Sequence, residues 1–228
     1  MQRRSGCADS QSDRHRGQQL NLKAVIQLPC LYAILDASQF QNSVAMLAAA
    51  EELSAGGVTL IQYRDKLGSP RHILEQAKEL RRMLGRSVRL IMNDRADLCL
   101  AAGFNGVHVG QDDLPPARVR RVIGDALWLG VSTHNPEQLK LADQTNADYL
   151  AIGPVFATSS KDRPDPVVGL EGVRRARQLT GKPLVAIGGI TRANARSAVE
   201  AGADAVAVIS DLLPSPRKSA EEFFRILG

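Results

Sequence analysis

The chain has 228 residues, of which 44% are hydrophobic and 23% charged, the balance of a folded globular protein rather than of a disordered one. Its longest unbroken apolar run, residues 44–50, has seven residues, whereas a membrane-spanning helix needs about 20. The net charge is +5, but residues 1–28 carry five basic and two acidic side chains and so hold +3 of it. With only nine aromatic residues as well, the chain lacks the basic, aromatic face typical of nucleic-acid binding. We expect neither a membrane nor a nucleic-acid partner.

The first segment of the chain differs in composition from the rest. Residues 1–28 are polar and lack the apolar stretch of a secretory signal. We predict a disordered tail over residues 1–28, with a targeting segment as the alternative, and one folded domain over residues 29–228. The three cysteines, Cys7, Cys30 and Cys99, form no C-x-x-C pair, which argues against disulfides and a zinc site and favours a cytoplasmic location.

From residue 29 onward, short aliphatic or β-branched runs alternate with segments whose apolar residues recur at helical spacing. Ile73, Ala77, Leu80 and Leu84 show that spacing clearly. The predicted strands are residues 31–35, 58–64, 88–92, 106–109, 127–131, 149–153, 184–187 and 205–209. Residues suited to a helix start stand before three of the helical segments: Pro115, Pro136 and Thr191.

Strands that alternate with helices indicate a parallel sheet, because each parallel connection needs a crossover. Eight such units in about 200 residues predict a single (β/α)8 TIM barrel, a fold that commonly has about 200–250 residues. A doubly wound open sheet is the alternative. It requires a glycine-rich G-x-G-x-x-G turn after the first strand, and the sequence has Asp36-Ala37-Ser38 there.

Polar side chains stand at the end of the second predicted strand, the end where such barrels carry their chemistry. Gln62, Arg64 and Lys66 are two residues apart, so they point to one side while the chain stays extended. An amide, a guanidinium and an ammonium together suit an anion with several oxygens, such as a diphosphate. An ordinary solvated edge is the alternative.

Two aspartates stand at neighbouring strand ends, Asp94 and Asp113. Magnesium is commonly held by one or two carboxylates together with substrate phosphate oxygens and water. Beside Arg64 and Lys66, the pair is interpreted as a metal–diphosphate clamp. The alternative is that each aspartate caps the helix that follows it.

A second anion site is predicted at the last two strands. Gly188-Gly189 and Ile209-Ser210 follow the seventh and eighth strands, where these barrels commonly bind phosphate through backbone N–H groups. A glycine pair that serves only a tight turn is the alternative. Two anion sites would suit two phosphorylated substrates.

Eight stretches carry a resemblance to a known family: 61–66 (IQYRDK), 93–97 (NDRAD), 106–115 (GVHVGQDDLP), 130–134 (GVSTH), 153–156 (GPVF), 158–161 (TSSK), 186–190 (AIGGI) and 208–210 (VIS). In this combination and order they resemble thiamine-phosphate synthase. The resemblance extends from residue 31 to the end of the chain and leaves the tail uncovered.

The resemblance implies a condensation of two small molecules. Hydroxymethylpyrimidine diphosphate loses pyrophosphate, the nitrogen of a thiazole phosphate attacks its methylene carbon, and thiamine phosphate forms. By resemblance, one Mg²⁺ per active site is held by Asp94 and Asp113, and Arg64, Ser132 and Lys161 are catalytic. The residues implied for the pyrimidine diphosphate are Gln62, Tyr63, Arg64, Asp65, Lys66, Asn93, Ser132 and Lys161. Those implied for the thiazole phosphate are Thr158, Ser159, Ser160, Gly189, Ile209 and Ser210.

Two other functions are weighed against this one. A related enzyme that tautomerises the thiazole phosphate has the same fold but needs no metal–diphosphate clamp, and a non-catalytic sensor of phosphorylated ligands would not need the clamp either. His134 is interpreted as a residue that shapes its loop, with a general base as the alternative, and His108 as a hydrogen-bonded interior residue. The pattern leaves the oligomeric state open.

Overall fold

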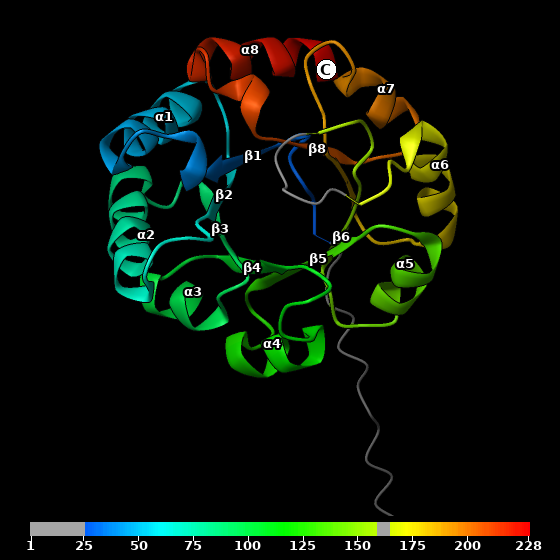
Figure 1. The fold of residues 1–228 in the computed structure, drawn as a ribbon, viewed down its shortest axis with the longest axis horizontal. Coiled ribbons are helices and arrows are strands. Elements are labelled where there is room, and N and C mark those ends of the chain that lie inside the picture. Colours follow the sequence, from blue (N-terminus) through cyan, green and yellow to red (C-terminus); the bar gives the residue numbers. More distant parts are fainter. Residues whose placement is uncertain (1–25, 159–164) are drawn as a thin grey trace, which may run out of the picture.

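The protein is described here by a computed structural model that covers residues 26–158 and 165–228. Within these residues eight parallel strands form a closed barrel in the order β1-β2-β3-β4-β5-β6-β7-β8, and the helices surround it (Figure 1). Because β1 pairs with β8, the sheet has no free edge, which excludes the open doubly wound alternative. The predicted (β/α)8 barrel is confirmed. No helix in these ranges is long and apolar enough to cross a membrane.

The strands lie at or near their predicted positions. They are β1 (Leu31–Asp36), β2 (Leu60–Arg64), β3 (Arg89–Asn93), β4 (Gly106–Val109), β5 (Trp128–Thr133), β6 (Tyr149–Ile152), β7 (Leu184–Ile187) and β8 (Ala205–Val208). β2 begins two residues later than predicted because Val58 still closes the preceding helix, its N–H donating to the carbonyl of Leu53 at 3.0 Å. β5 continues two residues further than predicted because its last two residues pair with β6.

Local signals set most helix starts. The helices are α1 (Ser43–Ala55), α2 (Pro70–Leu84), α3 (Ala96–Ala102), α4 (Pro116–Ile123), α5 (Pro136–Asp143), α6 (Gly169–Leu179), α7 (Ala195–Glu200) and α8 (Pro216–Leu227), with short 3-10 turns η1 (Ala37–Gln39) and η2 (Ser210–Leu212). Pro136 opens α5 as predicted, and Pro115 stands one residue before α4. Thr191 stands four residues before α7, and its carbonyl accepts the N–H groups of Asn194 and Ala195 in the turn that leads into that helix.

Side chains along each strand alternate between two buried clusters. In β1, Leu31, Ala33 and Leu35 face an outer cluster between strands and helices, and Tyr32 and Ile34 face the barrel interior. Since both faces are covered, the strands read as nearly continuous apolar runs, which explains why the sequence locates them. The interior cluster consists of Tyr32, Ile34, Leu60, Ile91, Tyr149, Ala151, Val185, Ala205 and Ala207.

Three arginines on alternate helices make equivalent contacts at the end where the strands begin. Each guanidinium donates to backbone carbonyls in the loop after its own helix. It also donates to the side-chain oxygen of an Asn or Asp that stands just before the second of the two strands that follow this helix. The same oxygen accepts the backbone N–H of a leucine in the first of those two strands. These three basal clamps are Arg81–Asn105–Leu90, Arg120–Asp148–Leu129 and Arg177–Asp204–Leu184.

The floor of the barrel is closed by residues from the beginning of the chain. Ile26 and Leu28 lie within the predicted tail, yet they pack against the interior cluster. Beside them the Arg89 guanidinium lies 3.8 Å from the centre of the Trp128 ring. Polar residues lie at the opposite end of the barrel, where the strands end.

Candidate active site

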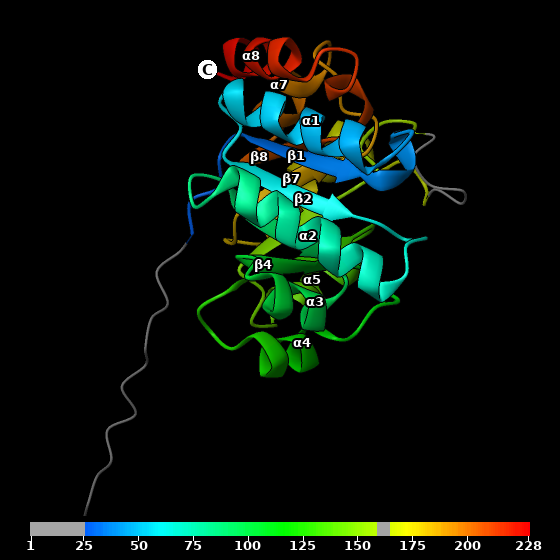
Figure 2. The same ribbon diagram turned by 90° about the vertical axis from the view of Figure 1, so that its left-hand side faces the viewer.

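A cavity opens where the strands end. Figure 2 shows β1 and β2 running side by side toward this end of the barrel, called the mouth below. The cavity has a volume of about 300 Å³ and reaches down into the barrel interior. Predicted site residues that line it are Gln62, Arg64, Asn93, Ser132, Thr158, Gly189, Ile209 and Ser210. The closed barrel therefore gathers at one cavity residues that are up to 148 positions apart, since 210 − 62 = 148.

The second strand supplies two of the inward-facing groups. Gln62 is buried and lines the cavity, and Arg64 stands one step nearer to the mouth. Arg64 forms an ion pair with Asp36 at the end of β1. Asp36 is itself fixed, because its other oxygen accepts the backbone N–H (3.1 Å) and the hydroxyl (2.7 Å) of Ser38. The guanidinium is thus held at the rim by a buried carboxylate.

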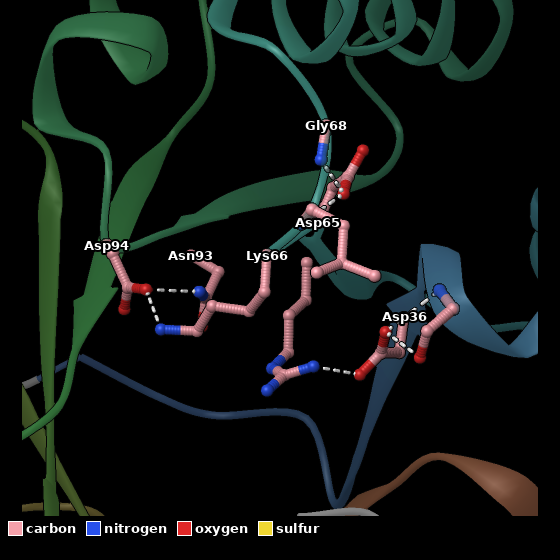
Figure 3. A network of polar contacts seen from close by, with 9 residues as sticks. Asp36, Asp65, Lys66, Gly68, Asn93 and Asp94 are labelled. Atoms are coloured by element: carbon pink, nitrogen blue, oxygen red, sulfur yellow. Dashed lines mark hydrogen bonds and ion pairs between the residues drawn. The ribbon is translucent and has the colours of Figure 1, made fainter.

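The third strand ends in a polar cluster that Figure 3 shows from close by. One oxygen of Asp94 accepts hydrogen bonds from Lys66 and from the Asn93 amide, the latter at 2.6 Å. The backbone of Asp94 has φ +59°, a left-handed conformation that Asp tolerates better than most residues. Its N–H donates to the His108 carbonyl at 2.8 Å, so the neighbouring strand stabilises this turn.

Asp94 lies against Asp113, and the two carboxyls influence one another. Burial, followed by the hydrogen bond with Asp113, raises the pKa of Asp94 to about 6. Burial acts in the same direction on Asp113, but the hydrogen bonds from Asp94 and from the Gly110 N–H outweigh it and lower the pKa of Asp113. Neither aspartate caps a helix: α3 and α4 have Arg95 and Pro115 at the cap position, without side-chain cap bonds. The helix-cap alternative is therefore wrong.

The donor set of this carboxyl pair restricts which metal could fit. Within residues 26–158 and 165–228, no group of three or more His, Cys, Asp or Glu side chains is arranged to hold an ion. Two carboxylates at a phosphate-binding rim suit Mg²⁺, which usually keeps waters and takes substrate phosphate oxygens as further ligands. They do not suit a structural zinc site, which needs four protein ligands.

The run from Gln62 to Lys66 divides into two groups. The Tyr63 side chain faces the outer cluster, and its hydroxyl donates to Asp65 at 3.4 Å. Asp65 accepts the N–H groups of Leu67 and Gly68 (3.0 and 2.7 Å), so it points into its own loop (Figure 3). Both line a second cavity of about 630 Å³ between the β1 and β2 loops, which Arg64 and Lys66 also line. Neither Tyr63 nor Asp65 lines the first cavity.

The glycine pair after β7 is required by close packing. Gly188 and Gly189 have φ of +94° and +64°. A Cβ on Gly188 would stand 2.5 Å from the Cβ of Pro154, and one on Gly189 would stand 2.4 Å from the Ala157 carbonyl oxygen. Phe156 N–H also donates to the Gly188 carbonyl at 3.0 Å. The loops after β6 and β7 are thereby joined, and Thr158 lies close to the predicted phosphate site.

Ser132 has a partner that the sequence did not reveal. His108 lies inside the barrel as predicted, and its Nε2 stands 2.8 Å from the Ser132 Oγ. The other ring nitrogen contacts the Tyr149 hydroxyl at 3.1 Å. Strand alternation gives the missing signal, because His108, Ser132 and Tyr149 all occupy inward-facing positions. Tyr32, which lines the cavity, and Tyr149, which contacts His108, are thus residues that the motifs alone did not indicate.

His134 holds the end of β6 in place. Its Nδ1 lies 2.6 Å from the Gly153 carbonyl oxygen, and its Nε2 lies 3.5 Å from Asp165. These contacts agree with the loop-shaping interpretation. Ser159, Ser160 and Lys161, which complete the predicted site, lie outside the described residues.

Comparison with known proteins identifies the family. Residues 31–212 match the family model described as thiamine monophosphate synthase. The chain belongs to the thiamine monophosphate synthase family. A thiamine-phosphate synthase of Koribacter versatilis (strain Ellin345) is 62% identical over 205 residues, covering 89% of this chain and 97% of the relative. One of Chloroflexus aurantiacus (strain ATCC 29366 / DSM 635 / J-10-fl) is 47% identical over 181 residues, covering 79% and 83%.

A solved structure agrees with this membership. The thiamine phosphate pyrophosphorylase of Pyrococcus furiosus superimposes with a TM-score of 0.77 at 34% identity, covering 86% of this chain and 94% of that one. A structure described as native KDPGal reaches a TM-score of 0.68 at 16% identity, covering 88% and 95%, and shows the fold alone. The range matched to the thiamine monophosphate synthase family contains every strand of the barrel and all predicted site residues from Gln62 to Ser210.

Proposed function

We propose that this chain joins 4-amino-5-hydroxymethyl-2-methylpyrimidine diphosphate to 4-methyl-5-(2-phosphooxyethyl)thiazole, or to its carboxylated form, and so makes thiamine phosphate and pyrophosphate. The observation that carries the proposal is the arrangement of the mouth. Cations and paired carboxyls lie at the ends of β2, β3 and β4, and a glycine-rich loop lies across the cavity after β7. Two phosphorylated substrates can therefore approach each other over the same cavity.

In this proposal the pyrimidine ring enters the cavity beside Gln62, Asn93 and Ser132. Its diphosphate then extends to Arg64 and Lys66 at the rim, where a guanidinium and an ammonium bind phosphate oxygens strongly. The thiazole phosphate takes the opposite side, which Thr158, Gly189, Ile209 and Ser210 line. We assign Ser159, Ser160 and Lys161 to the same mouth from the sequence.

The reaction needs no nucleophile from the protein. The bond between the methylene carbon and the diphosphate oxygen breaks, its electron pair leaves with pyrophosphate, and the thiazole nitrogen donates a pair to the same carbon. Negative charge grows on the leaving group as that bond breaks. Arg64, Lys66 and Lys161 stabilise this charge, because cations fixed in a partly dry site act without reorganising.

We propose that Asp94 and Asp113 hold one Mg²⁺. Bound there, the ion would supply positive charge to the oxygens of the diphosphate. One oxygen of Asp94 accepts from both Lys66 and Asn93, and the carboxyl also meets that of Asp113, so the two candidate ligands lie together. A cation at the pair would also favour the ionised form of Asp94, whose pKa is raised in its absence.

The direct test is an assay of the purified chain with both substrates, with Mg²⁺ or with EDTA. We expect thiamine phosphate and pyrophosphate in equal amounts, and only with the metal. Interconversion of thiazole phosphate tautomers without condensation would assign the chain to its tautomerase relative. Binding without any conversion would indicate the phosphate-ligand sensor. Either result would overturn the proposal.

The metal assignment has its own test. Asp94→Asn and Asp113→Asn should each lower kcat/KM at limiting Mg²⁺ by at least about 100-fold, on the scale of the several kcal/mol that a metal contributes to charge stabilisation. Asp112→Asn is the matched control, because Asp112 is exposed on the same loop as Asp113. Wild-type rates for both Asp94→Asn and Asp113→Asn would show that the metal is held elsewhere.

A further inference from the structure

A continuous series of hydrogen bonds crosses the barrel interior beneath the cavity. Gln62 Nε2 donates to the Tyr32 hydroxyl at 2.8 Å, and that hydroxyl lies 3.0 Å from the hydroxyl of Tyr149. Tyr149 contacts His108 Nδ1 at 3.1 Å, and His108 Nε2 contacts Ser132 Oγ at 2.8 Å. We call these five residues the interior chain. They come from β2, β1, β6, β4 and β5 in turn.

The interior chain is shielded from water except on the side that faces the cavity. Tyr149, at its centre, has no exposed surface, and Tyr32 is 1% exposed. Its two ends, Gln62 and Ser132, line the cavity. Space for the central contact depends on Gly130, where a Cβ would stand 2.2 Å from Cζ of Tyr149 and 2.4 Å from Nδ1 of His108. The absence of a side chain at Gly130 therefore leaves room for the contact between Tyr149 and His108.

Hydrogen-bond counting gives the interior chain one direction. A tyrosine hydroxyl has a single proton. The Gln62 amide donates to Tyr32, and one order gives every remaining proton an acceptor within the interior chain: Tyr32 donates to Tyr149, and Tyr149 donates to His108 Nδ1. In that order Nδ1 is the acceptor, so a neutral His108 carries its proton on Nε2 and donates it to Ser132.

The imidazole is neutral in these surroundings. Its two ring nitrogens face hydroxyl groups rather than carboxylates, and the residue is buried, so its charged form is disfavoured. Ser132 Oγ therefore accepts the hydrogen bond of His108, and the Ser132 hydroxyl proton is left to donate to a ligand in the cavity. At the other end one N–H of the Gln62 amide donates to Tyr32, and the amide carbonyl oxygen is an acceptor that a ligand can use.

We infer that Tyr32, Tyr149 and His108 are positioning residues that fix this order, so that the cavity presents an acceptor at Gln62 and a donor at Ser132. This inference rests on the proposed function for its ligand, an aminopyrimidine. That ring carries an amine that donates and ring nitrogens that accept, so it matches both ends. The reverse order would present the opposite groups and would favour a ring with a carbonyl in place of the amine.

The order of the interior chain can be tested without substrate. In the full ¹⁵N-labelled chain, two-bond ¹⁵N–¹H correlations identify which nitrogen of His108 carries the proton. We expect the Nε2–H form in the wild type and a mixture of both forms in Tyr149→Phe. Thr133→Val is the matched control, because it removes a buried hydroxyl next to Ser132 that donates instead to the Ala151 carbonyl. An Nδ1–H form in the wild type would overturn the inference.

Kinetics test whether the order matters for recognition. The quantity measured is the ratio of kcat/KM for the aminopyrimidine diphosphate to that for its 4-oxo analogue. Tyr32→Phe and Tyr149→Phe should each lower this ratio at least about tenfold and leave KM for the thiazole phosphate unchanged. Because both variants interrupt one path, the double variant should lose little more than the worse single one.

These experiments distinguish a failure of the inference about the interior chain from a failure of the proposed function. An unchanged ratio in both variants, or losses that multiply and extend to the thiazole phosphate, would reduce the interior chain to packing and overturn the inference. A wild type that makes no thiamine phosphate would overturn the proposed function, and the tautomer of His108 would still decide the order of the interior chain by itself.

Discussion

Asp94 directly follows β3 and His108 lies on the neighbouring β4, and burial moves both toward their neutral forms. It raises the pKa of Asp94 to about 6 and lowers that of His108 to about 4, because a low-dielectric site disfavours whichever form is charged. The consequences differ. Asp94 has Lys66 beside it and a rim position where a cation can restore its charge. His108 is enclosed by hydroxyls and stays neutral over the physiological range.

The His108 pKa predicts a dependence of stability on pH. The unfolded chain binds a proton at His108 below about pH 6.5, whereas the folded chain binds it only near pH 4. The free energy of unfolding should therefore fall between these values as the pH falls, by on the order of 3 kcal/mol in total. Asp94 acts in the opposite direction, because its pKa is higher in the folded chain.

Urea denaturation of the wild type and of His108→Asn in metal-free buffer, from pH 7 to 4.5, isolates this contribution. The stability advantage of the wild type over the variant should shrink as the pH falls, because only the wild type has the buried imidazole. Two parallel stability curves would contradict the assignment of a buried neutral His108.

At the scale of elements, the basal clamps join each even-numbered helix from α2 to α6 to the two strands that follow it. The clamp of Arg120 is the most buried, since both Arg120 and Asp148 have side chains 6% exposed. Its guanidinium also donates to the carbonyls of Gly124, Leu127 and Asn146 at 2.8 Å each. Such contacts fix the spacing between consecutive units of the barrel, far from the mouth.

Arg120→Met should lower the free energy of unfolding by about 3–5 kcal/mol, the usual result of leaving one member of a buried ion pair alone. The reason is that Asp148 would keep its charge without the guanidinium. Urea denaturation measures this, and kcat of the folded fraction should stay at the wild-type value. Arg121→Met is the control, because Arg121 is exposed on the same helix. Equal stability of the two variants would show that the clamp is not needed.

At the scale of the whole molecule, the barrel separates stability from chemistry along its axis. The basal clamps and the floor lie where the strands begin, the apolar interior cluster lies in the middle, and the polar residues of the candidate site lie at the mouth. This division is the one expected of the fold. The interior chain departs from it, because it carries polar groups of the site down into the apolar middle.

The floor gives a prediction about the start of the fold. A chain that begins at residue 26 should unfold at the same urea concentration as the full chain and keep its activity. A chain that begins at residue 30 lacks Ile26 and Leu28, which pack on the interior cluster, and should be less stable by about 2 kcal/mol or more. Equal stability of the two truncated chains would place the boundary at residue 29, as the sequence predicts.

Much of the fold and the rim of the site follow from local patterns. Strands covered on both faces must be apolar along their length, so runs such as 106–109 and 184–187 mark β4 and β7 without error. Parallel strands all end on one side, so Arg64, Asn93 and Ser132 are brought together by the topology alone. The helix-cap alternative for Asp94 and Asp113 is wrong because contacts at the strand ends hold their carboxyls, so neither one accepts a hydrogen bond from the first turn of a helix.

Other features depend on distances across the barrel, which no local pattern encodes. Lys66 reaches Asp94, whereas Tyr63 and Asp65 contact one another on the other side of the strand end. Strand alternation separates these two groups, but it does not give the partner that each side chain meets. The interior chain joins Tyr32 to Tyr149 over 117 positions. Sequence by itself determined which residues face inward and at which end they lie, because those properties follow from strand periodicity and parallel pairing. Only the tertiary structure decided which of them touch, because contact is set by the tilt and register of eight strands that close on one another.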